Sequence, residues 1–284
     1  MSAINSLLVG LIDYAGLYPP ARLDMRSATR NYLNYSQGRQ ADFLGRFVVA
    51  IDQLNEFRQA AGDSPGDWRL SVVGNAQTAR DSLQQHIESG FRIETIEIKV
   101  ERAAEIADIS RRIPAGIPAY FEVPVGDSDS EWLEAISAAG AGAKLRMGGV
   151  VAEAFPSPCA IANTVKALAD RGIRFKATAG LHHPIRSLHS FTYDANGPTG
   201  MMHGFMNLSC AAALLYFGGE ISDAQRLLEE QDNAAWQVTE EAIGWRGFAW
   251  SADQIRSIRR DSLTSFGSCS FEEPIQDLEA LGWL

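Results

Sequence analysis

Residues 93–100 read IETIEIKV and residues 117–125 read IPAYFEVPV, two short runs rich in β-branched and aromatic residues. Runs of this length and composition are typical of β-strands buried on both faces. Their starts lie 24 residues apart, which leaves room for one helix of roughly twelve residues and its connections. A strand, a helix and a second strand at this spacing predict a right-handed βαβ unit with parallel strands.

Further runs of the same kind repeat along the chain. They begin near Phe47, Leu70, Gly142 and Ile173, so that the successive starts of all six runs are 23, 23, 24, 25 and 31 residues apart. Helical periodicity fills the intervals. The pair Ser157-Pro158, for example, has the cap and the first-turn proline of a helix start, and Gly172 closes the same helix.

Two more strands are predicted at the ends of the repeat. Leu7–Asp13 is the expected first strand and Leu263–Phe271 the expected last, followed by a closing helix over Pro274–Leu281. Eight strands joined by helices predict an α/β fold of the (β/α)₈ TIM-barrel type. An open doubly wound sheet is the competing architecture, but no GxGxxG or P-loop motif follows the early strands. Because no low-complexity linker interrupts the chain, residues 1–284 are predicted to form a single domain.

The connection over residues 203–251 is longer than one crossover requires. It predicts a helical excursion, with one helix over Phe205–Tyr216 and another over Asp223–Glu230. A stretch rich in tryptophan follows, with Trp236, Trp245 and Trp250. Two roles are open for this excursion: it covers the barrel mouth, or it forms a contact in a homo-oligomer.

The composition restricts the partners of the protein. The 284 residues are 46% hydrophobic and carry a formal net charge of −10, which disfavours nucleic acid and anionic membranes. Three widely spaced cysteines show no zinc spacing, and no basic segment precedes an apolar run at the N-terminus. We therefore expect a cytoplasmic protein, and any local cluster of cations points to a small anionic metabolite as its partner.

Charged residues interrupt the second halves of several predicted strands. Strands buried in a barrel are normally apolar, and the catalytic face of a barrel lies at their carboxyl ends. The residues are Glu97 and Lys99, Glu122, Lys144 and Arg146, and Lys176 and Thr178. A buried unpaired cation costs several kcal/mol in rough terms, so Glu122, Lys144, Arg146 and Lys176 together predict a site rather than packing.

These residue types favour Schiff-base chemistry. A lysine near other cations has a lowered pKa, so Lys176 is predicted to attack a carbonyl as a neutral amine. Lys144 and Arg146 would hold the anionic part of the substrate, and Glu122 would move protons. The leading hypothesis is a class I aldolase or lyase that acts on a small anionic carbonyl compound and needs no cofactor.

Two alternatives stay open. His182 and His183, together with His203, His189 or Glu122, could hold a divalent metal in a hydrolase or isomerase, although no established metal motif is present. Under the leading hypothesis His182 or His183 orients the substrate instead. The other alternative is a barrel that binds a metabolite without converting it.

Four further positions are candidates for substrate binding. One is His203, which precedes a predicted helix and is expected to point into the barrel mouth. Asp13 ends the first predicted strand within the sequence DYAGLYPP, Ser268 lies in SFGSCS near the expected phosphate corner of the barrel, and Thr178 shares a strand face with Lys176. Cys269 has no base beside it in the sequence, which gives little support for a nucleophilic role.

Four blocks of the sequence carry a resemblance to a known family. They are DYAGLYPP at 13–20, KLRMGG at 144–149, FKATAGLHHP at 175–184 and FGSCSFEEPIQDL at 266–278. In this order they resemble a family of bacterial hypothetical proteins over nearly the whole chain, which implies no activity. KATAG at 176–180 is also similar to the Schiff-base strand of deoxyribose-phosphate aldolases, and this resemblance implies Lys176 as the nucleophile. The second lysine strand of those aldolases is missing, unless Lys144 with the following glycine pair replaces it.

Overall fold

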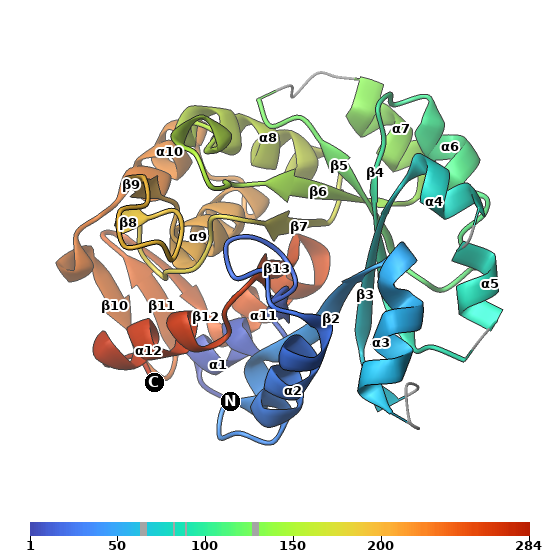
Figure 1. Ribbon diagram of the computed structural model, residues 1–284. Helices are drawn as coiled ribbons and strands as arrows, with labels where there is room; N and C mark the ends of the chain where they lie inside the picture. The colour runs from blue at the N-terminus through green and yellow to red at the C-terminus, as the bar shows by residue number, and fades with distance from the viewer. Residues whose placement is uncertain (63–66, 82, 89, 127–130) are drawn as a thin grey trace.

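A computed structural model describes residues 1–62, 67–81, 83–88, 90–126 and 131–284 (Figure 1). Its centre is a closed barrel of eight parallel strands in the order β1-β13-β7-β6-β5-β4-β3-β2, which confirms the predicted TIM-type barrel. The strands are β1 (Ile12–Tyr14), β2 (Leu44–Ala50), β3 (Leu70–Asn75), β4 (Ile93–Lys99), β5 (Ala119–Val123), β6 (Gly142–Arg146), β7 (Phe175–Thr178) and β13 (Leu263–Ser268).

Helices surround the barrel (Figure 1). They are α1 (Ala3–Leu8), α2 (Met25–Ser36), α3 (Leu54–Ala61), α4 (Ala76–Asp81), α5 (Leu83–Glu88), α6 (Glu105–Ser110), α7 (Glu131–Ala139), α8 (Pro158–Asp170), α9 (Phe205–Tyr216), α10 (Ile221–Glu229), α11 (Ala252–Asp261) and α12 (Glu272–Ala280). The predicted start of α8 is confirmed, since the Ser157 hydroxyl accepts a hydrogen bond from the Ala160 N–H at 3.2 Å. No described helix is long and apolar enough to cross a membrane.

The predicted first strand is wrong over most of its length. Residues 3–8 form α1, whose Ser2 hydroxyl accepts from the Asn5 N–H at 3.2 Å, and only Ile12–Tyr14 pairs with the barrel. Leu7 and Leu8 are both fully buried, so the apolar run reflects a helix packed on several sides rather than a strand. In a short apolar run, periodicity cannot distinguish a buried helix from a buried strand.

The excursion over residues 203–251 is only half helical. After α9 and α10 the chain forms an antiparallel sheet of β10 (Trp236–Val238), β11 (Ala242–Trp245) and β12 (Phe248–Ser251). This sheet packs beside α1, where the Ala3 N–H donates to the Glu240 carbonyl at 2.8 Å. The three tryptophans are buried, and residues 205–251 contribute nothing to the lining of the large pocket at the barrel mouth, so the excursion does not cover that mouth.

The strand alternation gives the barrel an apolar outer face and a polar interior. On β7, Phe175 and Ala177 are fully buried hydrophobic residues, whereas Lys176 between them contacts residues of β1 and β4. Neither β1 nor β4 neighbours β7, so these contacts cross the interior. In the register Lys144 on β6 pairs with Lys176 on β7 and with Glu122 on β5, which places all three at one level of the barrel.

Candidate active site

A pocket of about 480 Å³ opens at the carboxyl ends of the strands. Asn75, Lys99, Arg146 and Thr178, which end β3, β4, β6 and β7, all line it. Further lining residues are Glu97, Glu122, Lys144, Lys176, His182 and Cys269. The expectation that Glu122, Lys144, Arg146 and Lys176 meet in one cavity is therefore confirmed.

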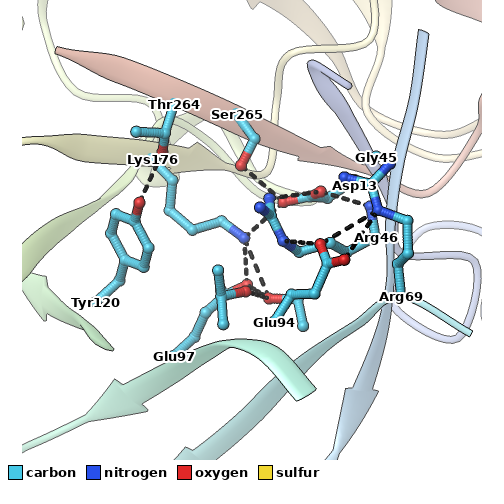
Figure 2. A network of polar contacts seen from close by, with 12 residues as sticks. Asp13, Gly45, Arg46, Arg69, Glu94, Glu97, Tyr120, Lys176, Thr264 and Ser265 are labelled. Carbon is cyan, nitrogen blue, oxygen red and sulfur yellow. Dashed lines mark hydrogen bonds and ion pairs between the residues drawn. The ribbon is translucent and has the colours of Figure 1, made fainter. Parts of the chain in front are cut away.

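Lys176 lies at the floor of this pocket and is 1% exposed. Its Nζ donates to Asp13 Oδ2 at 2.8 Å, to Ser71 Oγ at 3.3 Å and to Glu97 Oε1 (Figure 2). Burial alone would lower the pKa of Lys176, but the carboxylates of Asp13 and Glu97 raise it above its ordinary value. The predicted lowering of this pKa is wrong, because acids from across the barrel outweigh the neighbouring cation.

Glu97 connects the two lysines, and the sequence did not single it out as a site residue. Its Oε1 accepts from Lys176 and from the Ser71 hydroxyl, and its Oε2 lies 3.1 Å from Lys144 Nζ. Lys144 Nζ also lies 3.5 Å from Glu122 Oε2. Although burial alone would raise the pKa of Glu97, the two ammonium groups hold it well below its usual range. The carboxylate thus remains ionised between two cations.

Asp13 accepts a hydrogen bond from the Lys176 ammonium and is fully buried. Its Oδ2 accepts from the Ser265 hydroxyl at 2.7 Å and its Oδ1 from the Arg46 N–H at 2.7 Å. Gly45 is required beside it, because a Cβ at that position would lie 2.4 Å from Asp13 Oδ1. Asp13 is not among the residues that line the pocket, so its predicted role in substrate contact becomes one of positioning Lys176.

The charge network continues toward the amino ends of the strands. Arg46 Nε lies 3.2 Å from Glu94 Oε2, and Arg69 Nε donates to the same carboxylate at 3.2 Å (Figure 2). Arg46 and Arg69 line a second opening, together with Pro118 and Arg174, which directly precede β5 and β7. Asp13 and Arg46 thus link the pocket to the opposite end of the barrel.

Two cations at the rim are suited to bind an anion. Lys99 and Arg146 are exposed and line the pocket. Within the described part of the chain, neither has a carboxylate at ion-pair distance. Thr178 is half-buried, lines the pocket and pairs with Arg146 in the register of β6 and β7. Because a guanidinium can hold a carboxylate or phosphate with two parallel hydrogen bonds, Arg146 is the stronger anchor.

The two consecutive histidines have separate surroundings. His182 lines the pocket, with Nδ1 at 2.7 Å from Glu273 Oε2 and Nε2 at 3.8 Å from Cys269 Sγ. His183 does not line it and instead contacts Asp277 Oδ2 at 2.6 Å and stacks on His189 with ring centroids 3.3 Å apart. The structure therefore supports a site role for His182 only.

His203 and Ser268 also lie outside the pocket lining, contrary to prediction. His203 Nε2 contacts the Pro156 carbonyl at 2.8 Å, and burial lowers the pKa of the imidazole to about 4. Ser268 accepts from the Ser270 N–H at 3.3 Å. On β13, Ser265 and Gly267 face the interior, so strand alternation turns Ser268 away from it.

The histidines do not gather with acids into a metal site. Among the residues that the structure describes, no three His, Cys, Asp or Glu side chains are placed to hold one ion. His182, His183 and His203 instead have the separate partners given above. The ligand sets expected from the sequence therefore do not form.

The chain matches no protein-family model and no curated protein.

Proposed function

We propose that this protein is an enzyme that forms a Schiff base between Lys176 and a small anionic carbonyl compound, with lyase or aldolase chemistry. The observation that carries the proposal is a buried lysine at a pocket floor, in contact with two carboxylates and close to a second lysine. The side chains needed for amine attack, proton transfer and anion binding are thus all within one cavity.

The first step is activation of the amine. The raised pKa of Lys176 keeps it protonated at neutral pH, so it must transfer a proton before it attacks. The depressed pKa of Glu97 makes its carboxylate a poor acceptor for this proton, which therefore passes to solvent in the pocket. The neutral amine then adds to the carbonyl carbon, and the resulting hydroxyl leaves as water after it receives a proton, which forms the iminium.

The second step is cleavage of a carbon–carbon bond. The iminium takes up the electron pair of the breaking bond, while a base removes the proton from the hydroxyl group of the fragment that departs as a carbonyl compound. Glu122 is this base, since it is half-buried, lines the pocket and lies 3.5 Å from Lys144. Arg146 and Lys99 hold the anionic group at the rim.

Trapping with cyanoborohydride tests the proposal directly. Incubation with pyruvate or glyoxylate is expected to leave a reduced adduct on Lys176, detected by peptide mass spectrometry. Lys176→Met should abolish this adduct, whereas Lys166→Met should not, because Lys166 pairs with Asp170 on the outer helix α8. An adduct elsewhere, or none at all with these two probes and with aldehyde substrates, contradicts the proposal. Saturable binding of pyruvate without any adduct would favour the metabolite-binding alternative.

The rate of trapping is expected to rise with pH. The carboxylates raise the pKa of Lys176 above its ordinary 10.5. The fraction of Lys176 that is neutral therefore increases by about tenfold for each pH unit from 7 upward to that value. The initial rate of adduct formation on Lys176, measured from pH 7 to about 9.5 with the folded state checked by circular dichroism, should follow this increase. A rate that levels off near neutral pH would show that the amine is already free there.

A further inference from the structure

Two further reactive side chains, Cys269 and His182, line the same pocket and take no part in the Schiff-base steps given above. Cys269 follows β13, and its Sγ lies 3.8 Å from His182 Nε2. On the other side of the imidazole, Glu273 Oε2 lies 2.7 Å from Nδ1. A thiol, an imidazole and an orienting carboxylate thus follow one another in the order found in nucleophilic triads.

The surroundings of His182 favour the charged form of its imidazole. His182 is 7% exposed, and burial alone would lower its pKa, but its contacts with Cys269 and Glu273 raise it to about 9. The imidazole is therefore positively charged at neutral pH, and its Nε2 lies 3.8 Å from the Cys269 sulfur. The Tyr193 hydroxyl lies 3.6 Å from the same Sγ and supplies another polar contact.

The other two cysteines lack these neighbours. Cys159 is exposed on α8, where its Sγ contacts the amide of Asn163 at 3.4 Å. Cys210 is fully buried in α9, and burial raises the pKa of its thiol. Cys269 is 6% exposed, so solvent access alone would rank Cys159 above it in reactivity. Cys159 and Cys210 therefore serve as internal controls for the reactivity of Cys269.

We propose that Cys269 is a nucleophile for acyl transfer, with His182 as its acid–base partner and Glu273 as the residue that orients the imidazole. The substrate class is a small activated ester or thioester. The proposal stands independently of Lys176, because the triad comes from the segments after β7 and β13. Among the residues that the structure describes, its three side chains have their hydrogen bonds and ion pairs with groups other than Lys144 and Lys176.

The chemical step balances without any additional reagent. The thiolate attacks the acyl carbon and forms a C–S bond, while the alcohol or thiol of the substrate leaves with the bonding electron pair and takes the proton of the His182 imidazolium. Water then attacks the thioester and returns a proton to His182. The carboxylic acid departs, and the thiolate and imidazolium are restored.

Competitive alkylation tests the nucleophile. Under limiting iodoacetamide, peptide mass spectrometry should find Cys269 alkylated at least about tenfold faster than Cys159, despite its burial. His182→Gln and Glu273→Gln should reduce that rate, and Glu273→Gln has a matched control in Asp277→Asn. Asp277 lies one turn further along α12 and contacts His183 rather than His182. Faster alkylation of Cys159, or equal effects of the two α12 variants in proteins with unchanged thermal unfolding, would overturn the proposal.

The acyl step is tested with p-nitrophenyl acetate. The wild-type protein should release p-nitrophenol and carry one acetyl group on Cys269, and Cys269→Ser should abolish both while Cys159→Ser leaves them intact. Acetylation confined to other residues would refute acyl transfer. Since this readout does not involve reduction of an imine, it can fail while trapping at Lys176 succeeds, and the reverse is equally distinguishable.

Discussion

Lys176→Met is expected to lower the free energy of unfolding by about 3–5 kcal/mol, because it leaves two buried carboxylates without their cation. Asp13 is fully buried and Glu97 nearly so, and both contact the Lys176 ammonium. Methionine preserves most of the volume of the lysine side chain. The loss of stability is therefore caused by the missing charge rather than by a cavity. Urea unfolding at neutral pH measures it.

The matched control for this substitution is Lys166→Met. Lys166 pairs with Asp170 four residues later on α8, and both side chains are partly exposed, so its removal should change stability by less than about 1 kcal/mol. Adding Asp13→Asn to Lys176→Met should restore part of the lost stability, since it removes one of the uncompensated charges. Equal stabilities of the Lys176 and Lys166 variants would show that the buried acids are neutral in the folded protein.

Glu97→Gln is expected to be the other strongly destabilising substitution, again by about 3–5 kcal/mol at neutral pH. The reason is the reverse one: an amide oxygen replaces the charge that Lys176 and Lys144 share. Because the pKa of Glu97 is depressed in the folded state, its contribution is present above the unfolded value of about 4.5 and is lost as the pH falls through the lower folded value. The variant should therefore approach the wild type in stability in acid.

Urea unfolding of both proteins at pH 7 and at about pH 3 measures this difference. Glu279→Gln serves as the control, because Glu279 is exposed and accepts a surface hydrogen bond from Gln40 at 3.1 Å. A gap between Glu97→Gln and wild type that stays constant over this pH range would contradict ion pairing as its cause.

The barrel could be predicted because each of its strands and helices leaves a pattern in a short stretch of sequence. Each strand of the repeat is a short apolar run, and the interval between runs fixes the parallel crossover. The first strand failed for the same reason, since Leu7 and Leu8 are as apolar as a strand but are buried on a helix. The hairpin of β8 (Ser187–Ser190) and β9 (Thr199–Met202) was not predicted, because its residues are largely polar or small.

The sequence predicted several residues that line the site but not which acid pairs with which cation. Charges at strand ends identified Lys144 and Lys176 correctly as pocket residues. Which acid faces which cation depends on contacts across the barrel, and Lys176 and Glu97 are separated by 79 positions in the chain. Cys269 and His182 are 87 positions apart, so a search for a base beside the cysteine in sequence could not find it.

The ionic interior has one more consequence, for any attempt to redesign this protein. Asp13 contacts Lys176 on one side and Arg46 on the other, and Arg46 and Arg69 share Glu94 near the rear opening. Coulomb forces inside a protein are weakly screened, so replacing an arginine at the rear changes the electrostatic potential at the lysine without altering the shape of the cavity. Mutant libraries restricted to the cavity wall would omit these positions.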